Sequence, residues 1–372
     1  MSIILKSKEL LLYKIGLTLI RGVGDVNGKK LVAYCGGVEA VFKENKQNLL
    51  KIPGIGQSIV NSINDSKILL RAEEELKFIE KYKITPLFYL DDNYPMRLSH
   101  CVDSPILLYY KGNANLNSEK IISIVGTRNS SIYGRSVCEE IIKDLHPMNV
   151  LVVSGLAYGI DTCAHKASLK NGLKTIAVLG HGLDTIYPQQ NKNLSKELLK
   201  NGGLLTEFLS KSKPDRENFP KRNRIVAGLS DAVIVIESGK KGGALITANI
   251  ANSYNRDVFA VPGNLGEKLS EGCNNLIKTN RAALIQSAED IKYIMGWKNE
   301  VQVSIPKQRK LFVKLSEEEK IVYNILKEKN EIDIDTLRFA SGLSMSKVAA
   351  VLLNMEFERI IISLPGKIYR LC

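Results

Sequence analysis

The feature that most constrains the fold is a regular alternation of apolar runs and amphipathic stretches between residues 118 and 296. The apolar runs are almost uninterrupted, which is typical of strands buried on both faces of a sheet. Six strands are therefore expected, at residues 120–126, 150–155, 174–180, 202–208, 231–238 and 256–263. Because helix-like stretches follow most of them, the pattern predicts the α/β class, with a doubly wound parallel sheet.

Ligands of such sheets bind at the carboxyl ends of the strands, so the loops there are the candidate site. "SIVGTRNSSIYGR" carries Gly126 and Arg128 just after a strand, and "VVSGLAYGID" closes the next strand with Ser154 and Gly155. Helix-start N–H groups, hydroxyls and the arginine fork all bind phosphate. These loops therefore predict a phosphate-binding edge of the sheet.

Two basic segments flank the strand at residues 231–238. "FPKRNR" and "ESGKKGGALIT" supply the candidate residues Lys221, Arg222, Asn223, Arg224, Lys240, Lys241, Gly242, Gly243 and Thr247. Arg222 and Arg224 are two positions apart and cannot share one helical face, so at least one is expected to pack or pair internally. We interpret the two segments as anchors of one groove.

No set of bond-breaking residues is evident in these loops, and no catalytic residue, metal ligand or cofactor is assigned. The sequence contains no G-x-G-x-x-G, no G-x-x-x-x-G-K-[ST] and no G-x-S-x-G segment. Asp161 and His165 share one helix face, but the expected roles are capping for the first and packing or hydrogen bonding for the second. His181 has no second ligand at metal-binding spacing.

Composition limits the classes of protein to consider. The net charge is +13 and the pI about 9.3, which favours polyanionic partners. Six cysteines are scattered without CxxC spacing, so neither a disulfide framework nor a zinc site is expected. "MSIILKSKELLLYKIG" is too short and too often interrupted by lysine for a signal peptide or a spanning helix, so a cytoplasmic protein without membrane insertion is expected.

Flanking segments predict further domains. Residues 1–84 are predicted to be helical, with two turns, Gly22/Gly24 and Gly54/Gly56, that resemble helix-hairpin-helix elements. Two packed hairpins without a ligand explain them equally well. Residues 85–117 predict a connector with one or two strands that packs on the sheet domain, which extends to residue 298.

At the C-terminal side, residues 299–314 predict a polar linker. Residues 315–372 then predict three helices and a hairpin about Pro365-Gly366, the winged-helix pattern. Ser316 and Glu319 form an expected capping box at the first of these helices.

Six ordered motifs resemble those of the DNA-processing protein A (DprA/Smf) family. They are "IVGTRNSSIYGR", "VSGLAYGIDTCAHKASL", "VLGHGLDTIYP", "TEF", "FPKRNRIVAGLSDAVIVIESGKKGGALITANIA" and "VFAVPGN…SEGCNNLI", and the resemblance spans residues 85–296. It implies an extended Rossmann-like domain that binds single-stranded DNA, protects incoming strands in natural transformation and helps to load the RecA recombinase. It also implies a homodimer formed through that domain. The implied DNA contacts are Arg128, Ser154 with Gly155, and residues 221–224, followed by Gly242, Gly243 and Thr247.

Two other functions stay open. The "GGALITA" turn is similar to the phosphate loops of Rossmann-like phosphoribohydrolases, which would make this chain a nucleotide or phosphoribosyl hydrolase with Glu237 or Glu207 as its acid. A transcription factor built on the winged helix is the third possibility. Residues 310–372 carry 10 basic and 9 acidic residues, which counts against tight duplex binding.

Overall fold

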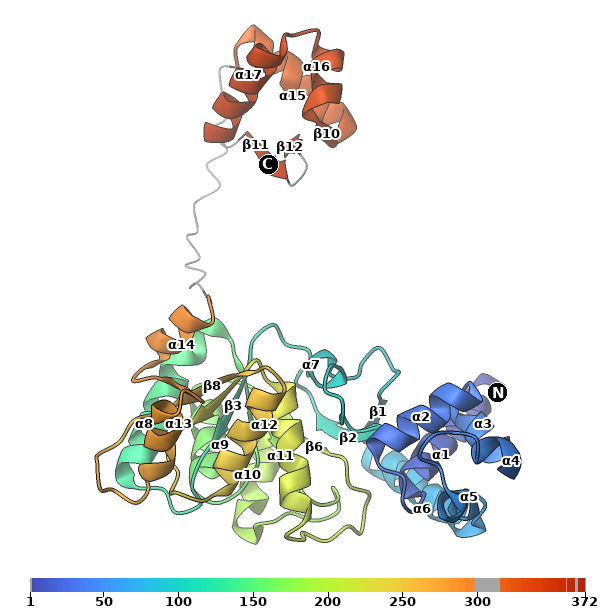
Figure 1. Cartoon of the computed structure of the whole chain (residues 1–372). Helices are drawn as coiled ribbons and strands as arrows, with labels where there is room; N and C mark the ends of the chain where they lie inside the picture. The colour runs from blue at the N-terminus through green and yellow to red at the C-terminus, as the bar shows by residue number, and fades with distance from the viewer. Residues whose placement is uncertain (1, 298–314, 359, 365–366, 372) are drawn as a thin grey trace. The chain divides into compact units, whose positions relative to one another are not determined.

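The computed structural model describes residues 2–297, 315–358, 360–364 and 367–371. The chain divides into two compact units, Met1–Glu300 and Val301–Cys372, each of which is described by itself (Figure 1). The expected linker at 299–314 and the Pro365-Gly366 turn lie outside the described residues. The division of the first unit at residue 84 stays a prediction.

A nine-stranded sheet forms the centre of the first unit, in the order β1-β2-β6-β5-β4-β3-β7-β8-β9. Its strands are β1 Thr85–Phe88, β2 Leu107–Gly112, β3 Ile121–Val125, β4 Leu151–Ser154, β5 Thr175–Val178, β6 Gly202–Thr206, β7 Ala232–Val235, β8 Asp257–Ala260 and β9 Ala283–Leu284. The strands from β6 to β9 in this order are parallel, and only β1 and β2 run antiparallel to their neighbours. All six expected strands are present within their predicted ranges, so the predicted fold class is confirmed.

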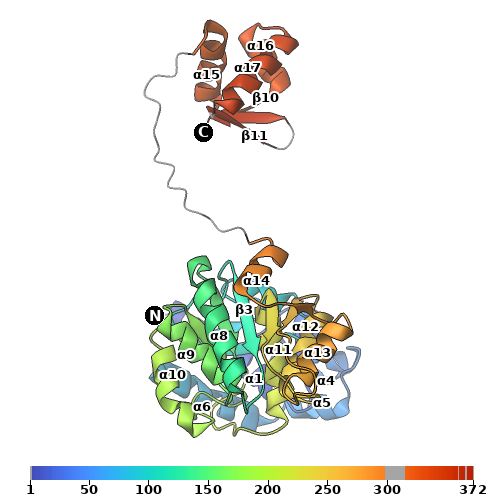
Figure 2. The ribbon, with the colours of Figure 1, turned by 90° about the vertical axis from the view of Figure 1, so that its left-hand side faces the viewer.

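Helices cover both faces of this sheet (Figure 2). They are α8 Ile132–Leu145, α9 Ile160–Lys170, α10 Lys192–Leu198, α11 Asn218–Leu229, α12 Gly243–Ser253, α13 Glu271–Lys278 and α14 Ala288–Ile294, with 3-10 turns at His146–Met148 and Gln189–Asn191. Separate apolar cores result. One joins α11, α12 and α13 to the sheet, a second joins α8, α9 and α14 to it, and a smaller one joins α10 to it.

The strand order reverses direction between β3 and β7. From β3 the chain proceeds outward through β4, β5 and β6 on one side, and later through β7 and β8 on the other. Crossover helices diverge at such a point and leave a crevice at the carboxyl ends of the two strands, which is where doubly wound sheets bind ligands. Of the candidate loops at the strand ends, the fold therefore indicates those after β3 and β7 as the ligand-binding site.

Six helices precede the sheet: α1 Ser2–Leu19, α2 Asp25–Cys35, α3 Val38–Lys43, α4 Lys46–Leu49, α5 Gln57–Ile63 and α6 Ser66–Tyr82. Gly22 and Gly54 take positive φ angles of 79° and 89°, as the two predicted turns require. The first of these turns lies against the sheet, because the Asp25 carboxylate accepts a hydrogen bond of 2.8 Å from the Ile106 amide. Side chains of β1 and β2 share one apolar core with these helices.

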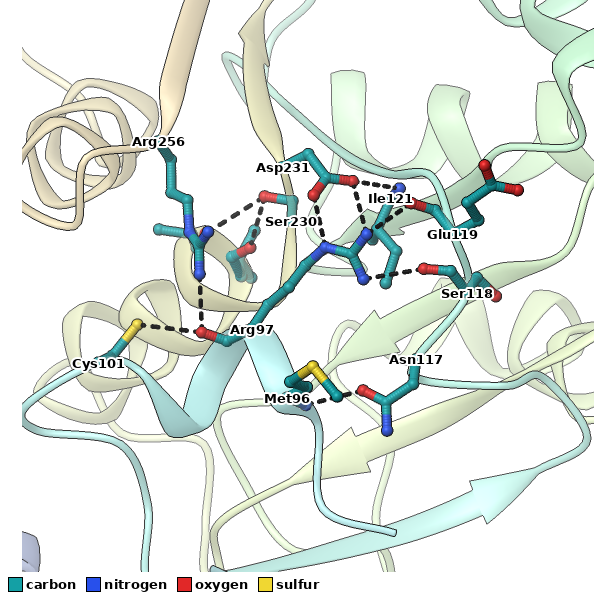
Figure 3. Close-up of polar contacts among 12 residues, drawn as sticks. Met96, Arg97, Cys101, Asn117, Ser118, Glu119, Ile121, Ser230, Asp231 and Arg256 are labelled. Carbon is teal, nitrogen blue, oxygen red and sulfur yellow. Dashed lines mark hydrogen bonds and ion pairs between the residues drawn. The ribbon is translucent and has the colours of Figure 1, made fainter. Parts of the chain in front are cut away.

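A short helix of the connector, α7 Met96–Ser99, is fastened to the sheet by Arg97 (Figure 3). Its guanidinium donates to both carboxylate oxygens of Asp231 at 2.5 and 2.9 Å, and to the carbonyls of Ser118 and Glu119. Asp231 also accepts from the Ile121 amide at the start of β3. One two-pronged ion pair thus joins the connector to the β3 and β7 strands that frame the crevice.

The second unit contains α15 Glu317–Lys329, β10 Glu331–Asp333, α16 Ile334–Ser341, α17 Met345–Phe357, β11 Ile361–Leu364 and β12 Ile368–Leu371. Its strands form an antiparallel sheet in the order β10-β12-β11. The capping box of Ser316 and Glu319 is present. In the part of the chain that the structure describes, no single helix is long and apolar enough to cross a membrane; only α16 and α17 together, bent by 110°, meet that test of length and composition.

Candidate nucleic-acid interface

A groove of about 600 Å³ lies at the carboxyl ends of β3 and β7. Its walls come from the loop after β3, the start of α9, the N-terminal turns of α11, and the glycine-rich turn that begins α12. Eight predicted site residues line it: Gly126, Arg128, Arg222, Asn223, Lys241, Gly242, Gly243 and Thr247. Loops that are far apart in the sequence therefore meet at one crevice.

The exposed rim of this groove is basic. Arg128 and Lys241 both line it from different loops, and Lys221 and Lys240 are exposed on the adjoining turns. Gly242 and Gly243 are exposed at the first turn of α12, where backbone N–H groups have no partner within the helix. Such an arrangement attracts phosphate by charge and by directed hydrogen bonds.

Arg222, by contrast, is buried beneath the groove. It is 5% exposed, and its Nη1 atom donates to the carbonyls of Gly155 and Val178 at the ends of β4 and β5. Burial lowers the pKa of Arg222, and the charge of Asp161 opposes that shift. The prediction that Arg222 holds a phosphate is thus at odds with its environment, because the side chain is buried, its Nη1 atom is bonded to the strand ends and its Nε atom donates to Asn223.

Arg224 is also turned away from the groove. Only 12% of its side chain is exposed, and it forms ion pairs with Glu207 and, at 3.0 Å, with Asp25 of α2. The expectation that at least one of the two arginines would pack or pair internally is therefore met by both of them. Arg224 links the N-terminal helices to α11 instead of contacting a ligand.

Three further predicted residues make contacts within the protein that support the groove. The hydroxyl of Ser154 donates to the Ile124 carbonyl at 2.7 Å, and that of Thr247 donates to Gly243 within α12 at 3.2 Å. Gly155 is required for space, since a Cβ there would lie 2.4 Å from the Arg222 guanidinium. We interpret these residues as support for the groove wall.

Two aromatic side chains complete the groove. Phe219 lies beneath the Arg128 guanidinium, whose carbon is 5.4 Å from the ring centroid, and the Tyr187 ring lies 6.0 Å from that of Phe219. Both rings line the cavity, and 44% of Tyr187 is exposed. Of the aromatic residues near the motifs, Tyr133 lines a different cavity and the hydroxyl of Tyr158 donates to Gln190.

Comparison with known proteins assigns a family to this arrangement. A family model described as DNA recombination-mediator protein A matches residues 85–295, which is more than half of the chain. The chain belongs to that family. The DNA processing protein DprA of Streptococcus pneumoniae is a relative with 38% identity over 260 residues, which cover 66% of this chain and 92% of the relative.

Two solved structures of the recombination-mediator family share the fold. The X-ray structure of DprA from Streptococcus pneumoniae matches with a TM-score of 0.63 and 35% identity, and the match covers 76% of this chain and 97% of that one. A structure of DprA from Helicobacter pylori matches with a TM-score of 0.53 and 29% identity, over 57% of this chain and 96% of that one. The latter structure concerns the single-stranded DNA binding mode of the Helicobacter protein.

In this chain the acids required by the hydrolase alternative are engaged elsewhere. The Glu237 carboxylate accepts hydrogen bonds from the amide and hydroxyl of Ser131 and faces a cavity beside the groove. Glu207 is paired with Arg224, and burial raises its pKa to about 7. The geometry gives no support to a nucleotide or phosphoribosyl hydrolase.

The two buried histidines are likewise committed to structure. His165 is fully buried, with Nδ1 at 2.7 Å from the Thr175 hydroxyl, and His181 bonds to the Gly182 carbonyl at 2.9 Å. Ser154 donates to a backbone carbonyl and so does not pair with His165. Among the described residues, no group of three or more His, Cys, Asp or Glu side chains could hold a metal ion.

Arg216 and Tyr187 are among the groove residues that sequence reasoning did not assign to the site. Arg216 is exposed and lines it from the loop after β6, and Tyr187 lines it from the loop after β5. Arg216 lies two residues before α11, in a polar stretch that carries no motif. Tyr187 precedes a proline, which marks a turn but gives no sign of its neighbours.

Proposed function

We propose that the groove binds single-stranded DNA and that this recombination mediator protects incoming strands in natural transformation and recombination. The observation that carries the proposal is the basic rim of Arg128, Arg216 and Lys241 around a groove with an aromatic wall. A rim of this kind tracks phosphates without regard to sequence, and Phe219 and Tyr187 offer faces on which bases stack. The Helicobacter pylori relative, whose single-stranded DNA binding mode has been studied structurally, supports it.

In detail, the side chains Arg128, Arg216, Lys221, Lys240 and Lys241 hold phosphates, and the N–H groups at Gly242 and Gly243 hold one more. Arg222, Arg224, Ser154, Gly155 and Thr247 shape the groove from below. The proposal includes no bond-breaking step, because the nearby acids and histidines are bound to other groups of the protein. We place this activity in the cytoplasm.

Titration of a labelled oligothymidylate at several salt concentrations tests this site. Arg128→Ala and Lys241→Ala are each expected to weaken binding by about three- to tenfold, and to lower the slope of log K against log salt by ~0.7, the value for one single-strand phosphate contact. Lys170→Ala, at the far end of α9, removes the same charge outside the groove and is the matched control. Equal DNA affinities and equal salt slopes for the wild type and all three variants would show that the groove is not the DNA-binding site.

We further propose that the protein acts as a homodimer formed through the α/β unit and that it loads the RecA recombinase. Both are consistent with membership of a recombination-mediator family. Sedimentation of the protein alone measures the first, and the rate of RecA filament assembly on single-stranded DNA, with and without the protein, measures the second. The expected result is a two-subunit mass for the protein alone and faster assembly of RecA filaments in its presence; a monomer, or filament assembly at an unchanged rate, would contradict the corresponding proposal.

A further inference from the structure

Two cysteines of the α/β unit meet at the contact between α8 and α9. These helices lie side by side against one face of the sheet (Figure 2). Cys138 of α8 is fully buried and Cys163 of α9 is 7% exposed, and both belong to the apolar core between the two helices and the sheet. Both are free thiols. The fold therefore brings together two thiols that no cysteine spacing in the sequence relates.

The position of the Cys163 sulfur is defined by its neighbours on α8. Its Sγ atom lies 3.7 Å from the Arg135 carbonyl oxygen and 3.9 Å from a carboxylate oxygen of Glu139. Arg135, Cys138 and Glu139 are spaced i, i+3 and i+4, so they share one face of α8. Cys163 thus contacts the turn from which the Cys138 side chain projects, and the two thiols lie within hydrogen-bonding distance of each other.

Small side chains allow the two helices to approach closely at this point. Ala164 and Ala167 of α9 are buried in the same core as the two cysteines. A disulfide requires its two Cβ atoms to be about 4 Å apart. Helices that pack through alanine and cysteine come near enough to each other for that separation, because the distance between helix axes depends on the size of the side chains at the contact.

The surroundings give the two thiols different acidities. A hydrogen bond from the Cys138 thiol lowers the pKa of Cys163. The charges of Arg135 and Lys166 lower it further, while burial and the Glu139 carboxylate oppose the shift. The same hydrogen bond, together with burial, raises the pKa of Cys138. Because the thiolate is the reactive form, Cys163 is the attacking sulfur and Cys138 is the thiol that resolves the product.

We propose that Cys138 and Cys163 form a reversible disulfide on exposure to hydrogen peroxide, so that the contact between α8 and α9 is a thiol modification site. The Cys163 thiolate attacks one oxygen of the peroxide, the O–O bond breaks, and hydroxide leaves a sulfenic acid on Cys163. The Cys138 thiol then loses its proton and attacks the Cys163 sulfur. The S–S bond forms, the S–O bond breaks, and the departing hydroxide takes the proton as water. Two thiols are oxidised to one disulfide, and the peroxide is reduced to two water molecules.

The disulfide joins two helices that begin at the groove. α8 follows the loop that carries Arg128, and the first turn of α9 contributes Asp161 to the groove wall. The oxidised protein is therefore expected to unfold at a higher denaturant concentration than the reduced protein, because the link restricts the unfolded chain. The site is independent of the proposed DNA binding, since no DNA takes part in the reaction.

Peptide mapping of the full-length wild type by mass spectrometry, after exposure to hydrogen peroxide, tests this site. One cross-linked pair of peptides that contain Cys138 and Cys163 is expected, lighter by two hydrogen atoms, and dithiothreitol is expected to restore both thiols. Cys35 is more exposed than either residue, but burial raises the pKa of its thiol. The cross-link is therefore expected to form at least about tenfold faster than Cys35 is oxidised. A wild type that is oxidised without this link, or whose Cys35 reacts first, would overturn the proposal.

Two variants test the order of the steps. In Cys138→Ala the resolving thiol is absent, so Cys163 is expected to gain oxygen atoms as sulfenic and then sulfinic acid. In Cys163→Ala the fully buried Cys138 is expected to stay reduced over the same period. Cys101→Ala changes a buried cysteine in a different core and is the matched control, expected to form the cross-link at the wild-type rate. Oxidation of Cys138 in the absence of Cys163 would contradict the assignment of Cys163 as the attacking sulfur.

Discussion

Replacing Arg222 with methionine is expected to lower the free energy of unfolding by about 3–5 kcal/mol, while the salt dependence of DNA binding by the folded protein stays unchanged. The loss arises inside the protein. The guanidinium donates to the strand-end carbonyls of Gly155 and Val178. Its positive charge also interacts favourably with the carboxylate of the buried Asp161. Methionine keeps a flexible, unbranched side chain but leaves the Asp161 carboxylate without its compensating charge.

Arg128→Met is the matched control, because the same side chain is removed from the rim of the groove. Its unfolding free energy is expected to change by no more than about 0.5 kcal/mol. Its DNA affinity and salt slope are expected to fall, which is the reverse of the Arg222 result. Denaturant titration and DNA titration of both variants, under conditions where both are folded, separate the two roles. A reduced salt slope for Arg222→Met would mean that the arginine reaches a phosphate after all.

The sheet could be predicted from the sequence because its determinants are local. Buried parallel strands are continuous apolar runs, and the tight turns that follow them require glycine at positions such as Gly126 and Gly155. A Cβ at Gly126 would lie 2.5 Å from the Ile160 side chain, so glycine there is dictated by close packing. The carboxyl-end rule then selected the candidate loops, which line one groove in the structure, without knowledge of strand order.

The sequence predicted less accurately which basic side chains face the groove, because the charge of a residue does not specify the direction in which its side chain points. Lys221, Arg222 and Arg224 occupy one turn of α11, yet only Lys221 is exposed there. The partner of Arg224 that decides its orientation, Asp25, lies 199 positions earlier in the chain. A pattern of neighbouring residues cannot reveal a partner so far away in the sequence. The two-residue spacing did indicate that the side chains of Arg222 and Arg224 point in different directions.

The edge strand β9 and the loop that carries Arg216 were missed for a related reason. β9 is two residues long and is defined by pairing with β8, so its apolar signal is too short to detect. Arg216 joins the groove because the loop after β6 passes beside α11, which depends on the fold of the whole sheet. Features set by long-range packing therefore had to come from the structure.

Below pH 6.5, His165 is expected to contribute a loss of about 1.4 kcal/mol per pH unit to the free energy of unfolding. Burial lowers the pKa of this histidine from 6.5 to about 3, and the charge of Arg222 adds to the shift. Its Nε2 atom has no hydrogen-bond partner in the described part of the chain, so nothing there stabilises a second proton. Between pH 6.5 and 3 the unfolded chain therefore binds a proton that the folded protein rejects, and stability is lost as the pH falls.

His165→Asn isolates this contribution, because the amide can keep the hydrogen bond to Thr175 but cannot be protonated in this range. Denaturant unfolding is measured from about pH 7 to about 4.5, where the wild type is expected to lose about 3 kcal/mol more than the variant. The variant itself is less stable at neutral pH, since the smaller side chain leaves a cavity, so the comparison rests on slopes. His146→Asn changes an exposed histidine and serves as the control. Parallel pH profiles for the wild type and His165→Asn would show that the buried imidazole gains its proton without loss of the fold.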